Sequence, residues 1–425
     1  MSNYKCVIAK IDSVQPISGA DFIHLAYVSG EQVIVSKTYN VGFVGALFVS
    51  GTQLSEEYCH NNNLFRETEK NKDNTKSGYF DNNRRVRAQP FKRLKSEAFF
   101  ISLDSFQYTG TDISKLKIGD SFEELNNHKI CTKYIDPLIK KTTKTEKVDK
   151  LGFKALYFKE HVETDQFVAG RYKIQKGDLV SIQSKRHGTS QRVGYMKTEL
   201  KLPKWKQLIN NVFPIFEKYK YEYILGSRRV ILNPSVPNPK EQYRWDVAAL
   251  LKPHLSKGMM VYIEIVGWNS ENQPIMGKHK ISNLKDKNYT KKYGDEIIYS
   301  YGANEGEFKF HIYRITITGD NGITIDFTQR QIVDWCNQRS LDPAYDVTEP
   351  FIFDGDHDTL LQKVKTLTER PEVLTEDYHD PRHISEGVII RVDNGGLTPL
   401  FLKSKSYAFK VCEGLQQAID IEETS

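Results

Sequence analysis

A lysine with a glycine three residues later is the first feature of this 425-residue chain that could do chemistry. Lys185 comes directly after the apolar run Leu179–Ser184 and precedes Gly188. A lysine at the exit of a strand, before a residue that lets the backbone turn tightly, is displayed where its amine can act as a nucleophile. The K-x-x-G pattern is weak alone, because residues 291–294 also match it and an exposed lysine is usually only a solvated charge.

Two glutamates occupy strand positions after this lysine. Glu264 lies within the apolar run 261–267, and Glu386 directly precedes the run 387–392. A carboxylate among apolar neighbours at a strand edge is costly unless it binds a metal ion, a hydroxyl group or a cation. Each glutamate could instead simply pair with a basic neighbour, as buried charges usually do.

Lys403 and Lys405 are two residues apart in the run 401–406. In an extended segment they lie on one face, where two cations repel each other unless an anion lies between or beside them. As ordinary surface lysines they would need no explanation, so their meaning depends on the other motifs.

The residues named so far belong to four short motifs that occur in a fixed order: K-x-x-G at Lys185, E-I-V-G at Glu264, E-G-V-I-I at Glu386 and L-K-x-K at Lys403 and Lys405. Together they are a strong signal. The second K-x-x-G, at 291–294, does not fit this order because it follows Glu264. The chain resembles the covalent nucleotidyltransferase superfamily of DNA ligases, RNA ligases and mRNA capping enzymes from about residue 150 to 410. The resemblance implies that Lys185 attacks the α-phosphate of a nucleotide and forms a lysyl-nucleoside monophosphate.

Three segments narrow this resemblance: residues 161–164, the hexamer 185–190 and the N-terminal stretch 14–23. Together they resemble the RNA ligase family with an N-terminal OB domain, sometimes called the fifth RNA ligase family. The resemblance implies a monomeric enzyme that uses ATP and Mg²⁺ or Mn²⁺ to seal RNA 5′-phosphate and 3′-hydroxyl ends in a nicked duplex, as in RNA repair. Arg186 departs from the pattern, because an apolar residue is common there.

The resemblance also implies roles for the charged residues. Glu386 would hold a hydrated metal ion, and Glu264 would contact the ribose or a metal-bound water. Lys405 would touch the α-phosphate, with Lys403 beside it. Because an amine must be neutral to attack phosphorus, these cations would help Lys185 by disfavouring a third positive charge.

Further nucleotide-binding residues follow from the same resemblance. His187 and Gly188 belong to the motif of the nucleophile, and Arg228 would engage a phosphate of the nucleotide or the RNA. Phe310 would stack on the purine, with Phe308 as the alternate. An aromatic residue on a strand is, however, more often part of the core.

The N-terminal part of the chain is typical of a β-meander. Short β-branched and aromatic runs are separated by Gly and Pro turn signals, and a fifth run would complete a small closed barrel such as an OB-fold. These runs are 6–11, 22–28, 32–36, 43–49 and 98–103. Residues 56–83 interrupt them like an insertion, and their polar composition predicts a mobile surface loop.

A basic segment, 84–95, follows that loop. Clustered cations suit a phosphate backbone, because each neutralised phosphate releases counterions. The alternative is a solvated strand edge that charge keeps soluble. The predicted RNA-binding residues are Arg84, Arg85, Arg87, Lys92, Arg93 and Lys95.

The predicted fold class is α+β. An OB-fold barrel (1–130) is followed by a basic linker (131–150) and an adenylyltransferase, ATP-grasp-like ligase domain of antiparallel sheets and helices (151–425). In this domain, strands are expected at 179–184, 260–267, 308–317, 322–327 and 387–392, and helices at 205–218, 243–255, 328–339 and 358–368.

The overall composition is compatible with an RNA ligase but does not by itself indicate one. The net charge of +6 is a mild basic excess, and the five cysteines form no C-x-x-C pair, which argues against a structural zinc site and a disulfide framework. The start of the chain lacks the apolar core of a signal peptide, and no window resembles a membrane span. We therefore expect a cytoplasmic or nucleoplasmic protein without a membrane partner.

Three other functions remain open. Capping guanylyltransferases and DNA ligases share the motifs, but both typically carry an OB domain after the last one, and only twenty residues follow Lys405 here. A non-catalytic RNA-binding protein with a degenerate transferase domain is the alternative from another class. The complete set of motif residues argues against it.

Overall fold

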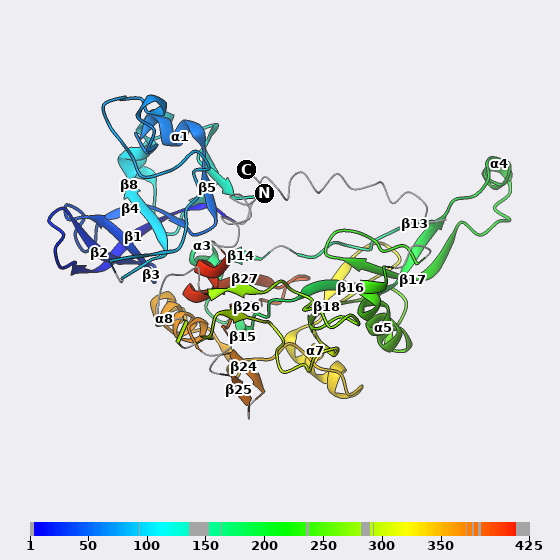
Figure 1. The fold of residues 1–425 in the computed structure, drawn as a ribbon. Helices are drawn as coiled ribbons and strands as arrows, with labels where there is room; N and C mark the ends of the chain where they lie inside the picture. Colours follow the sequence, from blue (N-terminus) through cyan, green and yellow to red (C-terminus); the bar gives the residue numbers. More distant parts are fainter. Residues whose placement is uncertain are drawn as a thin grey trace.

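The computed structural model describes residues 4–92, 94–135, 153–162, 164–234, 238–281, 290–291, 293–370, 372–375, 378–380 and 384–413. An N-terminal module built mainly of strands lies against a larger module of sheets and helices (Figure 1). This mixture confirms the predicted α+β fold class. Helices in the described part of the chain are all too short or too polar to cross a membrane.

The N-terminal module contains the predicted barrel. Its five strands are antiparallel and ordered β3-β2-β1-β4-β8, and β3 adjoins β8 where the Glu97 amide donates to the Gln32 carbonyl at 2.7 Å. This order, nearly closed, is that of the expected OB-fold. The strands are β1 (Cys6–Pro16), β2 (Ile23–Val28), β3 (Glu31–Ser36), β4 (Val44–Val49) and β8 (Ala98–Ser102).

Residues 56–83 are folded against the barrel, so the prediction of a mobile loop is wrong. They form α1 (Glu56–Asn61) and η1 (Thr68–Lys70), and they bury Tyr58, Phe65 and Phe80 in an apolar cluster with side chains of β1 and β4. A few widely spaced aromatic residues give the segment its own core, although its average composition is polar. The buried side chain of Asn71 accepts a hydrogen bond from the Phe65 amide and donates one to the Phe65 carbonyl, so it satisfies both backbone groups of that residue.

Smaller elements complete this module: β5 (Thr52–Leu54), β6 (Gln89–Phe91), β7 (Leu94–Ser96), η2 (Leu103–Thr109), η3 (Ile113–Lys115), β9 (Ser121–Phe122), β10 (Glu124–Leu125), β11 (His128–Lys129) and β12 (Cys131–Lys133). Strand β12 pairs with β5. Residues 136–152, which include most of the predicted linker, lie outside the described residues, so the domain boundaries remain predictions.

Two sheets form the larger module. The first is antiparallel and contains β13 (Phe153–Ala155), β16 (Thr189–Leu200), β17 (Tyr219–Ser227), β18 (Met259–Gly267), β21 (Phe308–Thr318) and β22 (Thr324–Asp326). The second has the order β14-β27-β26-β15-β23, from β14 (Asp165–Gln166), β15 (Leu179–Ser184), β23 (Phe351–Ile352), β26 (Gly387–Asp393) and β27 (Leu400–Lys405). All five strands that the sequence predicted here are present, whereas β16 and β17 were not predicted.

Helices cover the outer faces of both sheets. Residues of α5 and α7 pack with the first sheet in one apolar cluster, and α8 packs with the second. The helices are α3 (Phe167–Gly170), α4 (Lys204–Val212), α5 (Gln242–Leu251), α7 (Gln329–Asn337) and α8 (His357–Thr368). Helix α4 ends six residues before the predicted position, because Pro214 forces Phe213 into an extended conformation.

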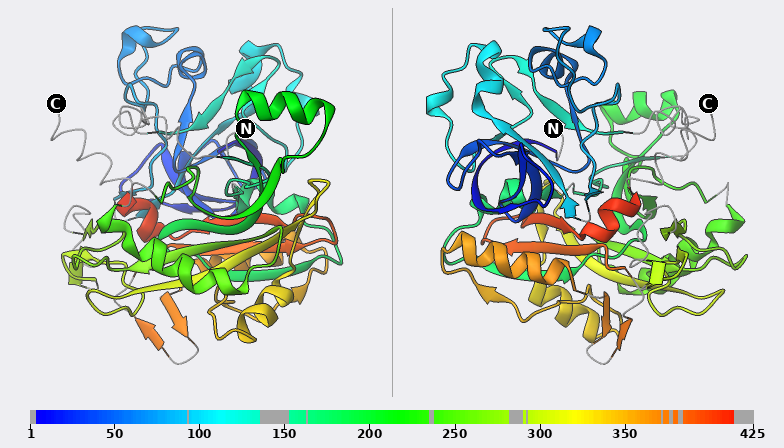
Figure 2. Two further views of the ribbon diagram at one scale, coloured as in Figure 1. Left: turned by 90° about the vertical axis from the view of Figure 1, so that its right-hand side faces the viewer. Right: turned by 60° about the vertical axis from the view of Figure 1, so that its left-hand side comes forward.

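Short elements join these parts: η4 (Arg171–Lys173), η5 (Pro239–Glu241), η6 (Lys252–His254), β19 (His279–Lys280), β20 (Glu296–Ile297), β24 (Glu372–Thr375) and β25 (Tyr378–Asp380). The right view of Figure 2 shows the N-terminal module, in blue and cyan, over the orange helix α8 and the red strand β27, and β1 also contacts α3. The contact therefore involves the strand that carries Lys403 and Lys405.

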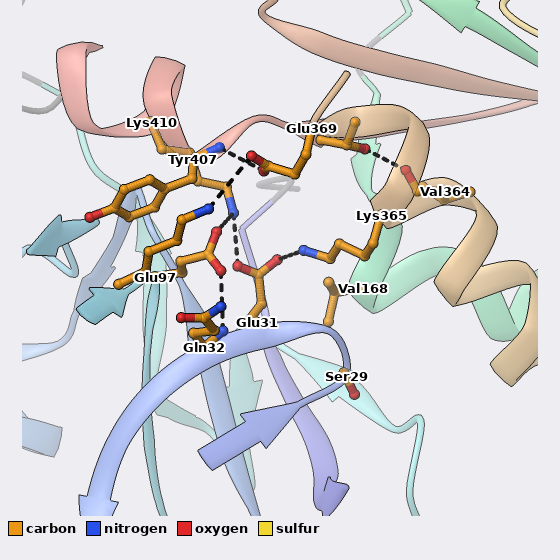
Figure 3. A network of polar contacts seen from close by, with 12 residues as sticks. Ser29, Glu31, Gln32, Glu97, Val168, Val364, Lys365, Glu369, Tyr407 and Lys410 are labelled. Carbon is orange, nitrogen blue, oxygen red and sulfur yellow. Dashed lines mark hydrogen bonds and ion pairs between the residues drawn. The ribbon is translucent and has the colours of Figure 1, made fainter. Parts of the chain in front are cut away.

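Buried ion pairs join the two modules, as Figure 3 shows. The carboxylate of Glu31, which is 3% exposed, pairs with Lys365 of α8 and, at 2.8 Å, with Lys410. Lys410 also lies 3.3 Å from Glu97. Burial alone would raise the pKa of Glu31, but the two lysines outweigh it and lower the pKa to about 2.

Replacing Glu31 with Gln should destabilise the protein strongly. Lys365 and Lys410 would then be buried without their shared carboxylate, which typically costs about 3 kcal/mol or more. Urea unfolding measures the loss, and Asp112→Asn at the exposed Asp112–Lys115 pair is the control expected to change nothing measurable.

The ion pairs of Glu31 also predict that the stability of the protein depends on pH. The Glu31 pKa is lowered in the folded state, so its contribution is complete above the ordinary value of 4.5 and is lost as the pH falls towards 2. The stability difference between wild type and Glu31→Gln should therefore shrink in that range. A constant difference would contradict the assignment.

Candidate active site

A cavity of about 520 Å³ lies where the two sheets meet the N-terminal module. The loop after β15 forms one side, and strands β18, β21, β26 and β27 form others. Tyr4 and Lys133 reach it from the N-terminal module. Most of the sequence-predicted catalytic and nucleotide-binding residues line it, namely Lys185, His187, Gly188, Arg228, Glu264, Glu386, Lys403 and Lys405.

The side chain of Lys185 is held by Glu386. Its Nζ lies 2.8 Å from Oε1 of Glu386, whose residue is 3% exposed. The register of β15 and β26 brings them together, since Ser184 pairs with Val388 and the Lys185 amide donates to the Gly387 carbonyl. Burial would raise the pKa of Glu386, but Lys185 and Lys405 lower it overall, so the carboxylate is ionised at neutral pH.

Lys405 has a second partner that the sequence motifs did not reveal. Both carboxylate oxygens of Glu413 lie 2.9 Å from its Nζ, whereas Glu386 is 3.7 Å away. Burial lowers the pKa of Lys405, but Glu413 and Glu386 raise it overall. Glu413 lies in a helical segment that begins at Tyr407, and nothing in the sequence distinguishes it from a solvated glutamate on a helix.

Lys403 lies on the same face of β27 as Lys405, as the two-residue spacing predicts. Its Nζ is 5.3 Å from the centre of the Tyr4 ring, and the residue is 9% exposed. Burial, followed by repulsion from Lys405 and Lys185, lowers its pKa to about 7. Near neutral pH this lysine is therefore present in both charged and neutral forms.

Glu264 binds the loop that carries Lys185. Its two carboxylate oxygens accept hydrogen bonds from the Gly188 amide at 3.1 Å and the Ser190 hydroxyl at 2.8 Å. Burial raises the pKa of Glu264 to about 6, although Lys185 and these bonds oppose the rise. Gly188 is required sterically, because a Cβ there would lie 2.5 Å from the Ile265 carbonyl oxygen.

His187 is fixed by aromatic neighbours. Its amide donates to the Tyr301 hydroxyl at 2.6 Å, and its ring stacks on His279. Its Nδ1 lies 3.8 Å from Oε2 of Glu386. Burial lowers the pKa of His187, so the ring is mostly neutral at neutral pH.

Phe308 and Phe310 do not line the cavity. They pack against the apolar cluster on the other face of the first sheet. His311 and Tyr313 line the cavity instead, because His311 lies opposite Glu264 in the β18–β21 pairing. The more polar set of alternating residues on β21 was the signal that could have identified this face.

The predicted RNA-binding cations have partners within the protein. Arg84 donates to the Leu54 carbonyl, and Arg85 lies over the Tyr134 ring. Lys92 donates to the Gly19 carbonyl. Lys95 lies 3.8 Å from Glu369 of the larger module.

Arg87 is half-buried, and Arg93 lies outside the described residues. Several of these cations thus contact other parts of the protein. Their contact with RNA remains a prediction.

A divalent metal ion is compatible with the cavity. Oε2 of Glu386 is buried and has no hydrogen-bond partner in the described part of the chain. No group of three or more His, Cys, Asp or Glu side chains among those residues is placed to hold a metal ion by itself. Mg²⁺ commonly uses only one or two carboxylates together with substrate phosphates and water, so this sparse set suits it.

The raised pKa of Glu264 predicts a pH-dependent stability. Since the folded state holds this proton more tightly than the unfolded chain, wild-type stability falls as the pH rises from the ordinary value of 4.5 through about 6. Glu264→Gln removes the titration, so its stability relative to wild type should rise by about 1 kcal/mol from about pH 5 to 8. Urea unfolding at both pH values measures this, and an unchanged difference would contradict it.

Comparison with solved structures shows the fold. A substituted form of Naegleria gruberi RNA ligase with ATP and Mn matches with a TM-score of 0.55 and 15% identity over 97% of this chain and 99% of that chain. The ligase with PPi matches with a TM-score of 0.54 and 14% identity over 96% and 98%. A substituted apo form has a TM-score of 0.57 and 15% identity, also over 96% and 98%.

No protein-family model matches the chain, and no curated protein does so either. Identity is low, but the structural match extends over nearly the full length of both chains. The chain therefore has the fold of these RNA ligase structures throughout.

Proposed function

We propose that this chain is an ATP-dependent RNA ligase that seals 5′-phosphate and 3′-hydroxyl ends. The observation that carries the proposal is the meeting of Lys185, Glu264, Glu386, Lys403 and Lys405 in one cavity. They come from separate parts of the sequence and share one cavity in a fold also found in an RNA ligase whose structures hold ATP, AMP or PPi. A repair role on nicked duplex RNA, by a monomer, is part of the proposal.

Three transfers at phosphorus make up the proposed reaction. The Lys185 amine forms a bond to the α-phosphorus of ATP, and the bond to pyrophosphate breaks. The AMP then passes to an RNA 5′-phosphate, which regenerates the lysine. Finally a 3′-hydroxyl attacks that 5′-phosphate, forms the phosphodiester and releases AMP.

The residues around Lys185 serve each transfer. Glu386 fixes the direction of the amine through its 2.8 Å contact. Lys403 and Lys405 place positive charge beside the phosphate as its oxygens gain negative charge. Because the pKa of Lys403 is about 7 without nucleotide, a bound phosphate would favour its charged form.

Glu386, with Glu264, would hold a Mg²⁺ or Mn²⁺ ion. Such an ion supplies charge that polarises phosphoryl oxygens. Glu264 also holds Gly188 and Ser190, so it would fix the loop of the nucleophile against the nucleotide sugar.

Labelling with α-labelled ATP tests the proposal. Wild type with Mg²⁺ should acquire a covalent, acid-labile label on a denaturing gel, and Lys185→Ala should acquire none. Lys291→Ala, at the second K-x-x-G motif, is the matched control and should label like wild type.

Other nucleotides and outcomes separate the alternatives. Preference for GTP would indicate a capping-type guanylyltransferase, and sealing of DNA but not RNA would indicate a DNA ligase. No label on folded, AMP-free wild type would favour a non-catalytic RNA-binding protein.

The rings on β21 give a second test. His311→Ala or Tyr313→Ala should raise the KM for ATP by about tenfold, because the loss of one base-stacking ring costs about 1–3 kcal/mol. Phe310→Ala should leave this KM unchanged and lower the melting temperature, because its ring packs in the core. The opposite pattern in a labelling assay would restore Phe310 as the stacking residue.

A further inference from the structure

A long hairpin projects from the larger module and ends in α4, as Figure 1 shows at the right of the molecule. We call residues 195–223 the arm. Strand β16 pairs with β18 only as far as Gly194, so the arm extends beyond that neighbour. Helix α4 has no buried residue, and at the tip Leu208 is 68% and Val212 70% exposed.

Both ends of the hairpin lie at the candidate active site. Strand β16 begins at Thr189 and β17 ends at Ser227, and both residues line the cavity. Their register joins Gln191 to Ser227 and continues outwards to Glu199 and Tyr219. The arm is therefore continuous with the cavity wall.

The tip of the arm carries positive charge that no acidic residue in the described part of the chain neutralises. Residues 200–216 contain no Asp or Glu. Lys201 and Lys204 are exposed, and no ion pair links either one to another described residue. Lys218, by contrast, lies 3.4 Å from Glu199.

Aromatic and aliphatic side chains lie among these lysines. Trp205 and Phe216 meet edge to face, and Lys206 lies over both rings. Trp205, Phe213 and Ile215 are exposed. Strand β13 pairs with the arm as far as Leu200, and α4 lies beyond that pairing. An exposed patch of this kind at the end of a hairpin indicates a binding surface.

We propose that the arm binds the RNA substrate outside the cavity. The inference rests on the proposed function and identifies a surface that holds the RNA away from the reacting ends. Lysines interleaved with exposed rings match a phosphate backbone with neighbouring sugars and bases. A second copy of the arm would bring like charges together, which disfavours self-association as the reason for the exposed patch.

The length of the arm defines where the contact lies. From Ser190 at the cavity to Leu200 near the tip of the arm, an extended strand covers about 33 Å. This is roughly one turn of a nucleic-acid duplex. RNA that ends within a few base pairs of the nick cannot reach the tip.

The experiment compares two doubly substituted full-length proteins. Lys201→Ala/Lys204→Ala removes two exposed charges of the arm, and Lys176→Ala/Arg330→Ala removes two exposed charges elsewhere in the larger module. Trp205→Ala tests the ring. Affinity for nicked RNA duplexes is measured by fluorescence anisotropy across a salt series, with about 6 or about 14 base pairs on each side of the nick.

We expect both arm variants to bind the long duplex about tenfold more weakly. The slope of log Kd against log salt should fall by about 1 to 2 in Lys201→Ala/Lys204→Ala and stay unchanged in Trp205→Ala, which removes no charge. Wild type should prefer the long duplex on at least one side, and the arm variants should lose this preference. The control variant should behave like wild type. Labelling by ATP needs no RNA and should be unchanged in all variants.

Equal RNA affinity and salt dependence in wild type and arm variants would overturn the inference. It would also be overturned if sedimentation showed a wild-type dimer that Trp205→Ala converts to a monomer without changing RNA affinity. Failure of the proposed function is distinct, because wild type itself would then neither label with ATP nor seal RNA.

Discussion

The carboxylate of Glu386 is almost fully buried, and Lys185 at 2.8 Å and Lys405 at 3.7 Å keep it ionised there. Removing such a charge from water is unfavourable unless opposite charges and hydrogen bonds replace the water. Each partner is placed by a strand of the second sheet, because β26 lies between β15 and β27. The order of that sheet and the position of the candidate nucleophile are thus linked.

Further ion pairs lie between Glu386 and the contact of the N-terminal module with the larger module. Glu413 neutralises Lys405, while no carboxylate among the described residues forms an ion pair with Lys403, whose pKa is lowered to about 7. Glu31 of the barrel pairs with Lys410, which belongs to the same segment as Glu413. The N-terminal module therefore supports the C-terminal side of the cavity as well as supplying Tyr4 and Lys133 to it.

The cavity keeps groups in states that are costly for stability. Glu264 has a pKa of about 6 because of burial, and Oε2 of Glu386 has no hydrogen-bond partner among the described residues. Perturbed and incompletely satisfied groups gather at functional sites, where a ligand supplies the missing contacts. The arm likewise keeps apolar side chains exposed at its tip, which is the basis of its proposed contact with RNA.

Local sequence patterns were sufficient for the barrel strands and for the order of the nucleophile, glutamate and lysine motifs. Each of these depends on near neighbours: strand alternation, a glycine after a lysine, or a charge beside an apolar run. The pairing of Glu413 with Lys405, the packing of residues 56–83 and the position of His311 and Tyr313, rather than Phe310, at the cavity were not accessible in this way. They depend on which distant segment covers each face, because burial and charge pairing are set by neighbours in space rather than in the chain.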